Sequence, residues 1–310
     1  MTTITASMVK DLREKTGVGM MDCKQALAES NGDIDAAVDW LRAKGLSKAA
    51  KKSDRIAAEG LVGVASDGKR GAVVEVNSET DFVARNDQFQ DMVRNIASLA
   101  PVAAGDRDQL LVTTYPGKSG TVQDFITESI ATVGENMTLR RTDVVEVGEG
   151  VVADYVHNKV SDGLGKIGVL VGLESAGDAD KLMTFGRQIA MHVAASAPLA
   201  LTPDELDTET IEKERAIYLE QAQSTGKPQE IIEKMVEGRL RKEYYQQVVL
   251  LQQTFVVDGK ASVEQALKTF EKELGKPVRI SKFVRYALGE GIEKNADDFA
   301  AEVAAAAGTN

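Results

Sequence analysis

The chain has 310 residues, of which 43% are hydrophobic and 27% charged, a usage typical of globular proteins and unlike that of fibrous or disordered chains. Its formal net charge of −11 argues against a protein that holds nucleic acid through a basic surface. A single cysteine, Cys23, excludes an intramolecular disulfide framework. No signal-like or membrane-length apolar run is found, so we expect a cytoplasmic protein without a membrane partner.

Residues 1 to 45 predict a bundle of three short helices. Cap and stop residues place these helices at about 5–17, 20–29 and 33–45. The string from Asn31 to Leu41 resembles the last helix of ubiquitin-associated domains, which bind a partner through an apolar patch. Met20 and Met21 would form the exposed part of such a patch, because methionine adapts to partner surfaces. The alternative interpretation is that both methionines fill gaps in a small core.

A two-lobed core is predicted after a short helical linker at residues 46–58. The first lobe spans 59–147, with strands and helices expected at 61–66, 72–77, 88–99, 121–135 and 137–147. The second lobe spans 148–288, with elements expected at 151–157, 165–173, 179–195, 248–257, 262–274 and 278–288. An antiparallel helical hairpin at 203–245 is inserted into it. Residues 289–310 predict a C-terminal helical module, and the fold class is α+β.

The two lobes repeat one another in sequence. Gly71 and Gly168 are separated by 97 residues, and so are Pro101 and Pro198. Apolar positions of the strand and the helix between them match at the same separation. The sequence therefore contains an internal duplication of a turn, strand, loop and helix unit.

The loop of the first copy, Thr80-Asp81-Phe82-Val83, carries an aromatic residue beside an acid where polar residues are usual. One interpretation is that Phe82 folds back onto the core. The other is that it faces a partner, which the second copy favours because it has Ala179 and Asp180 at the positions of Phe82 and Val83.

No catalytic or cofactor motif emerges from the sequence. Two histidines, His157 and His192, and one cysteine lack the spacing of a zinc site, and His192 is expected to pack in the core. The Gly-Glu-Gly strings at 148–150 and 289–291 lack the context of a phosphate loop. We therefore predict a binding protein that uses no metal and no cofactor and does no covalent chemistry.

Several long strings resemble the elongation factor Ts family over nearly the whole chain. They are the segments Thr16–Lys24, Glu75–Ala84, Ile189–Ser196, Glu233–Arg239 and Gly289–Val303. The resemblance implies a guanine-nucleotide exchange factor for the GTPase elongation factor Tu. It implies that Thr80, Asp81, Phe82 and Val83 displace magnesium from the GTPase. It assigns partner contact to Met20, Met21, Lys24 and His157, although extra residues at 161–165 depart from the family pattern close to His157.

Two other classes of function stay open at this point. An adaptor that binds ubiquitin-like proteins or nascent chains would explain residues 1–45 but not the duplicated lobes, and an unrecognised enzyme would lack a site. The inserted hairpin carries more apolar residues than two paired helices can bury. These residues need the second lobe, the GTPase or a second copy of the chain, so a homodimer or a two-plus-two complex is a further expectation.

Overall fold

The computed structural model describes residues 4–16 and 18–293, apart from the side chains of residues 46–48. It mixes helices and strands, as the α+β prediction requires. The terminal helix expected within 294–310 lies outside the described residues. The chain divides into two compact units: the first comprises residues 1–63, 74–142 and 287–310, and the second comprises residues 64–73 and 143–286.

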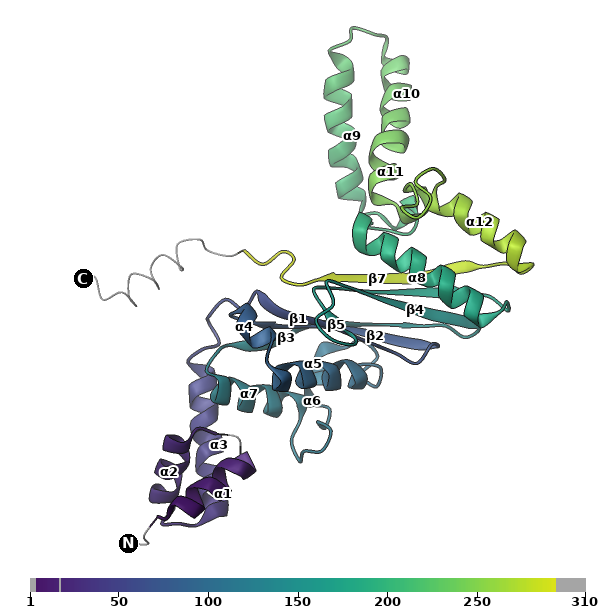
Figure 1. The fold of residues 1–310 in the computed structure, drawn as a ribbon. Coiled ribbons are helices and arrows are strands. Elements are labelled where there is room, and N and C mark those ends of the chain that lie inside the picture. Colours follow the sequence, from purple (N-terminus) through teal and green to yellow (C-terminus); the bar gives the residue numbers. More distant parts are fainter. Residues whose placement is uncertain (1–3, 17, 294–310) are drawn as a thin grey trace. The chain divides into compact units, whose positions relative to one another are not determined.

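The first unit begins with three helices, α1 (Ala6–Thr16), α2 (Met20–Glu29) and α3 (Ile34–Ala50). The three helices lie close together (Figure 1). The small core that they enclose includes Leu12, Cys23 and Leu27. The predicted end of the third helix at Gly45 is wrong, because α3 continues to Ala50. A Cβ at Gly45 would lie 3.2 Å from Cβ of Ala131 in α7 (Val122–Val133). Close packing of α3 on α7 thus offsets the low helix propensity of glycine.

The strands β1 (Glu59–Ser66), β2 (Arg70–Ser78) and β3 (Met137–Glu146) lie in the order β3-β2-β1 and run from one unit into the other. Within the first unit, α5 (Asp87–Leu99), α6 (Arg107–Val112) and α7 lie along one face of them (Figure 1). The inward face of α5 follows the helical period and consists of Phe89, Met92, Val93, Ile96 and Ala97. Helix α6 was not predicted, although Asp106 caps it through the backbone N–H groups of residues 108 and 109.

In the second unit, β4 (Gly150–His157), β6 (Ile167–Glu174) and β7 (Arg279–Ala287) form a sheet in the order β4-β6-β7. β4 pairs antiparallel with β6, so that residue 150 faces 174 and residue 157 faces 167. α8 (Ala179–Ser196) and α12 (Val263–Leu274) share one apolar core with these strands. The short strand β5 (Leu164–Gly165), which the sequence did not predict, follows Gly163, whose carbonyl accepts from the Val64 N–H at 2.8 Å.

The strand predicted at 248–257 is wrong. This segment holds the end of α11 (Tyr245–Val248) and the 3₁₀ turn η3 (Leu250–Gln252), followed by irregular backbone. Its backbone bonds go to the chain after α8: Leu199 N–H donates to Val248 O at 2.8 Å and Leu250 N–H to Ala200 O at 2.8 Å. An apolar run predicts burial, but it does not by itself distinguish a strand from a buried irregular segment.

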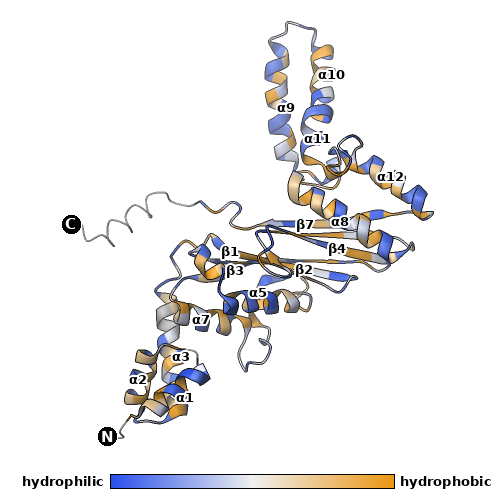
Figure 2. Ribbon diagram, in the orientation of Figure 1, coloured by the Kyte–Doolittle hydropathy of each residue, from blue (hydrophilic) through white to orange (hydrophobic). Residues whose placement is uncertain are grey.

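Two long helices, α9 (Thr208–Gln223) and α10 (Gln229–Arg239), pack on each other and are joined by a reversal at 224–228. α10 continues through the π-helical turn η2 (Leu240–Tyr244). The first helix starts later than the sequence predicted, because Pro203–Glu205 forms the separate 3₁₀ turn η1 and Asp207 caps α9. Figure 2 shows α9 as largely hydrophilic. No helix in the described part of the chain is long and apolar enough to cross a membrane.

The sequence repeat is visible in the elements of both units. β2 begins at Arg70 and β6 at Ile167, which are separated by 97 residues. Gly60 and Gly150 each open the preceding strand with φ of +118° and +133°, where a Cβ would collide with the carbonyl oxygens of Val76 and Leu173. These two acceptors are also separated by 97 residues. Each copy therefore needs glycine at the same place, where the opposite strand approaches most closely.

Candidate functional site: an exposed aromatic tip

Phe82 lies in the one-turn helix α4 (Asp81–Ala84), which follows β2, and its residue surface is 73% exposed. The interpretation that it folds back onto the core is therefore wrong. Its neighbours Val83 and Ala84 are 6% and 4% exposed and fix the turn to the first unit. We call the segment Thr80–Val83 the tip. Of its four residues Phe82 is the most exposed, while the buried Val83 anchors the segment.

The exposure of Phe82 follows from a break between α4 and α5. Asn86 caps α5 by accepting hydrogen bonds from Gln88 N–H at 2.8 Å and Phe89 N–H at 3.2 Å. In the second copy, Ala179 is the counterpart of Phe82, and α8 runs from that residue without interruption to Ser196. The first copy therefore differs by splitting one helix in two, and the detached turn carries the aromatic side chain.

A charged pair flanks the ring. The guanidinium of Arg85 donates to Asp81 at 2.9 Å, and its carbon lies 5.9 Å from the centroid of the Phe82 ring. Both charged side chains are largely solvated, so the pair contributes at most about 1 kcal/mol to stability. Its effect is to present an aromatic face with one acid and one base beside it.

The start of the tip is hydrogen-bonded to the loop between α7 and β3. The Thr80 N–H and hydroxyl donate to the two oxygens of Glu135, at 3.0 Å and 2.8 Å. The backbone N–H of Asn136 donates in return to Glu79 at 2.5 Å. Two adjacent residues of one segment are thus bonded to two adjacent residues of the other. Backbone and side-chain donors are both used, which restrains position and orientation together.

The predicted partner-binding residues of α2 form a second exposed surface. Met20 and Met21 are 58% and 78% exposed, and Lys24 is exposed as well. Cys23 and Leu27 lie on the opposite, buried side of the helix. The core-filling alternative for the two methionines is therefore wrong. The large apolar side chains that α2 leaves uncovered are concentrated in its first turn.

His157 ends β4 in the second unit, and its side chain is exposed. The Tyr155 hydroxyl lies 3.2 Å from His157 Nδ1, and the backbone carbonyl of His157 accepts from Lys166 N–H at 3.1 Å. The extra residues at 161–165 hold β5 within the chain that returns from His157 to β6. His157 belongs to the second unit, whereas the segment Thr80–Val83 and α2 belong to the first.

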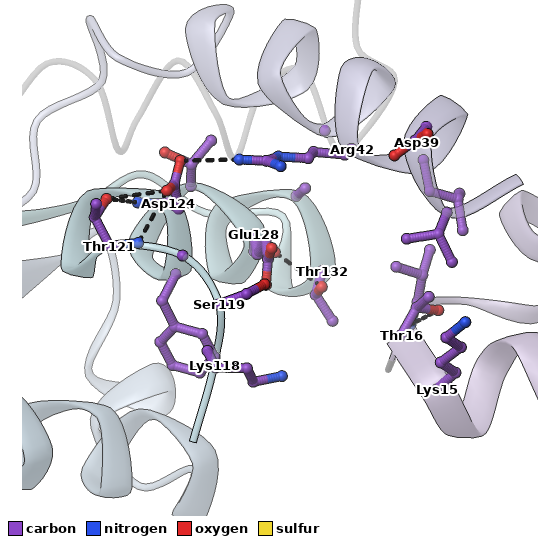
Figure 3. Close-up of a pocket in the computed structure, with 18 residues that line it drawn as sticks. Lys15, Thr16, Asp39, Arg42, Lys118, Ser119, Thr121, Asp124, Glu128 and Thr132 are labelled. Atoms are coloured by element: carbon purple, nitrogen blue, oxygen red, sulfur yellow. Dashed lines mark hydrogen bonds and ion pairs between the residues drawn. The ribbon is translucent and has the colours of Figure 1, made fainter. Parts of the chain in front are cut away.

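A groove of about 400 Å³ separates the N-terminal helices from α7 (Figure 3). An ion pair of 3.5 Å joins Arg42 to Asp124. Hydrogen bonds from Thr121, first from its backbone N–H and also from its hydroxyl, lower the pKa of Asp124, and Arg42 adds to this. This carboxyl therefore completes the capping box of α7. Its bonds have a structural explanation, and the groove shows no nucleophile activated by a neighbouring base.

The chain is similar to known proteins over almost its whole length. The family model described as elongation factor TS matches residues 79–290, which include the tip. The chain is 60% identical over 307 residues to elongation factor Ts of Parvibaculum lavamentivorans, covering 99% of both chains. It is 58% identical over 306 residues to that of Rhizobium etli, also covering 99% of both. The chain belongs to the elongation factor Ts family.

A third relative, elongation factor Ts of Bartonella henselae, is 57% identical over 304 residues, covering 98% of this chain and 99% of that one.

His192 of the present chain is fully buried, and its Nε2 lies 2.9 Å from the Gln253 side-chain oxygen. This burial confirms the prediction of a packed core residue, and it also lowers the pKa of His192. In the described residues no group of three His, Cys, Asp or Glu side chains could hold a metal ion.

Sequence reasoning missed the support of the tip. It interpreted Gly134 to Met137 only as the opening of a strand, whereas Gly134 ends α7 with φ of 92° and Glu135 then reaches Thr80. The usable signal was a glycine at a helix end followed directly by an acid and an amide, which indicates a chain reversal with side chains free to bond backbone groups. It also missed Glu75, whose carboxylate is fully buried and accepts hydrogen bonds from Arg140 and Arg141.

Proposed function

We propose that this chain is a translation elongation factor that binds elongation factor Tu in its GDP state and promotes GDP release, so that GTP can bind. It acts as a guanine-nucleotide exchange factor in cytoplasmic protein biosynthesis and does no covalent chemistry. The observation that supports this most directly is Phe82, an aromatic side chain held in solvent on an anchored turn in a member of the elongation factor Ts family. An exposed aromatic side chain held in this way is typical of a residue that a protein partner buries on binding.

In the proposed mechanism the segment Thr80 to Val83 displaces the magnesium ion of the partner. A GTPase holds its nucleotide through phosphate contacts and Mg²⁺, so a partner that distorts the metal site weakens nucleotide binding. Phe82 acts as the wedge and Asp81 is its polar neighbour. The buried Val83 anchors the segment to the first unit. By thermodynamic reciprocity, the nucleotide must weaken the exchange factor by the same factor.

The energetics require more than one contact. Accelerating release by about 10⁴-fold takes about 5.5 kcal/mol of differential interaction, whereas burying one phenylalanine yields about 1.5 to 3 kcal/mol. The remainder has to come from a wider interface. Met20, Met21, Lys24 and His157 are the side chains we assign to it, and all four are exposed.

The finer organisation of the chain is part of the same proposal. The bundle at 1–45 serves as a ubiquitin-associated-like module, the duplicated lobes at 59–147 and 148–288 form the core, and the helical hairpin at 203–245 extends the surface for the GTPase or for a second copy of the chain. A homodimer or a two-plus-two complex with the GTPase is the assembly that a second copy would give. The net charge of −11 disfavours direct nucleic-acid binding.

Nucleotide release from the GTPase tests the proposal. Elongation factor Tu loaded with fluorescent GDP is mixed with excess unlabelled nucleotide, with and without the chain, and the loss of fluorescence is followed by stopped flow. We expect release to accelerate by several orders of magnitude at saturating chain. Unchanged release in the presence of a folded chain would contradict the proposal and return the adaptor class to consideration.

A further inference from the structure

The bond between Glu135 and Thr80 continues a regular pattern that begins inside the sheet. Glu75 of β2 bonds to Arg140 of β3, Glu79 bonds to Asn136, and Thr80 bonds to Glu135. As β2 advances by five residues, its partner on the other segment moves back by five. This is the pattern of antiparallel pairing, here carried by side chains beyond the ends of both strands.

The side chain of Thr80 has two possible uses at this position. Thr80 is the N-cap of α4, where a hydroxyl ordinarily accepts from a backbone N–H of the first turn, yet it makes no such cap bond. Its hydroxyl instead donates to Glu135 Oε1. The helix thus forgoes its cap, and Thr80 is tied to the segment that follows α7.

The loop that carries Glu135 is itself anchored on both sides. Asn136 is 8% exposed, and its side-chain amide donates to the backbone carbonyls of Ser53 at 3.3 Å and Arg55 at 2.7 Å. Lys52 donates from its ammonium to the Gly134 carbonyl. Glu135 is therefore attached to a fixed point of the first unit rather than to a free loop.

We propose that Glu135 is a positioning residue for Phe82: its carboxylate grips Thr80 and holds α4 in the orientation in which the aromatic ring enters the partner. A helix of four residues has almost no stability of its own, because helix nucleation is unfavourable. Without the grip only the buried Val83 and Ala84 hold the turn, so it samples a wider range of orientations, and ordering it on binding consumes free energy that the wedge needs for exchange. Glu135 acts through Thr80, and this role rests on the proposed exchange function.

Glu135→Gln is the sharpest test of the grip, because it keeps the size of the side chain and removes the charge. One of its two acceptor positions becomes an NH₂ group, which cannot accept from Thr80. In the free chain we expect amide hydrogen exchange of the segment 80–85 to accelerate roughly tenfold, as for loss of one charged hydrogen bond. Glu128→Gln is the matched control, since Glu128 is an exposed acid on α7 whose side chain has no bond to the tip.

Exchange kinetics then separate positioning from general stability. Glu135→Gln should slow GDP release at saturating chain roughly tenfold, with Glu128→Gln at the wild-type rate. In a Phe82→Ala background, the Glu135 substitution should slow release far less, because Glu135 acts through the ring. Thr80→Val removes the hydroxyl by another route and should show the same dependence on Phe82. If either variant is poorly folded by circular dichroism, the other decides.

Three outcomes would overturn the proposal. These are unchanged hydrogen exchange at 80–85 in both variants, normal GDP release in both, or an equal loss of rate with and without Phe82. Failure of the exchange function itself has a different signature, because the wild-type chain then leaves GDP release unchanged. In that case hydrogen exchange in the free chain still decides whether Glu135 holds the tip.

Discussion

Phe82→Ala should slow nucleotide exchange while leaving the folding of the free chain intact. Phe82 is 73% exposed, so its side chain contributes little hydrophobic stabilisation to the free protein. On binding, most of the ring becomes available for burial in the partner, which is worth about 1.5 to 3 kcal/mol. We therefore expect GDP release at saturating chain to slow by roughly one to two decades.

The stability of the same variant gives the complementary measurement. Exposed substitutions usually change the free energy of unfolding by no more than about 0.5 kcal/mol, so the melting temperature should shift by no more than about two degrees. Phe89→Ala is a buried contrast, because Phe89 is 3% exposed in α5 and its loss should cost about 3 to 5 kcal/mol. Val112→Ala removes an exposed apolar side chain elsewhere in the first unit and should alter neither quantity.

The assay is stopped-flow release of fluorescent GDP over a range of chain concentrations, together with thermal unfolding by circular dichroism. The concentration series distinguishes a lower maximum rate from weaker binding. If the Phe82→Ala chain promotes GDP release from elongation factor Tu at the wild-type maximum rate, the wedge is refuted. A chain that melts many degrees lower would show that the ring supports the fold, contrary to its exposure.

Three further predictions concern other parts of the chain. Met20→Ser combined with Met21→Ser should weaken partner binding in a calorimetric titration without lowering the melting temperature, because both side chains are exposed; unchanged affinity would remove α2 from the interface. Ile217→Ser with Ile231→Ser, on α9 and α10, should leave GDP release at saturation unchanged while altering partner affinity or sedimentation; slower release at saturation would make these helices part of the exchange step. Glu75→Gln should cost about 1.5 to 3 kcal/mol of unfolding free energy near neutral pH in urea titrations, because the half-buried Arg140 and Arg141 lose their charged acceptor; a loss below about 1 kcal/mol would contradict this.

The Glu75 prediction also has a pH dependence. Burial raises the pKa of Glu75, but hydrogen bonds from the Gly289 N–H and the Arg141 guanidinium outweigh it and leave the pKa below the ordinary value. A carboxyl with a lowered folded-state pKa stabilises the fold fully above its unfolded pKa, about 4.3, and loses this contribution as the pH falls through the folded value. The stability difference between wild type and Glu75→Gln should therefore narrow in acid below about pH 4.

Periodicity and caps predicted most of the regular elements, because those signals are local. The inward stripe of α5 and the alternating start of β3 are set by residues a few positions apart. The errors occurred where a distant segment decides the conformation. Gly45 remains helical because α7 packs on it, and the apolar run after α11 is irregular because its backbone bonds go to the chain after α8.

The candidate site divides in the same way. An aromatic beside an acid in a loop was enough to single out Phe82, and its divergence from Ala179 in the second copy indicated function. The sequence could not decide whether the ring was buried, because that depends on the break at Asn86 between α4 and α5. Nor could it find Glu135, which is 55 positions from Thr80 in the sequence and meets it through the arrangement of β2 and β3.

The proposed wedge, a four-residue helix, depends on two anchoring points: one inside the pair of strands β2 and β3, and one just beyond their ends. Glu75 is fully buried and accepts from Arg140, Arg141 and the Gly289 N–H, so it fixes the interior of the strand pair. Five residues further along the chain, just beyond the end of β2, Glu135 bonds to Thr80. The distance between these two points along an extended chain is about 17 Å. The segment from Glu75 to Thr80 is hydrogen-bonded to charged side chains at both ends, which restrains its orientation. The position of Phe82 therefore depends on β2 and β3 more than on the short helix α4.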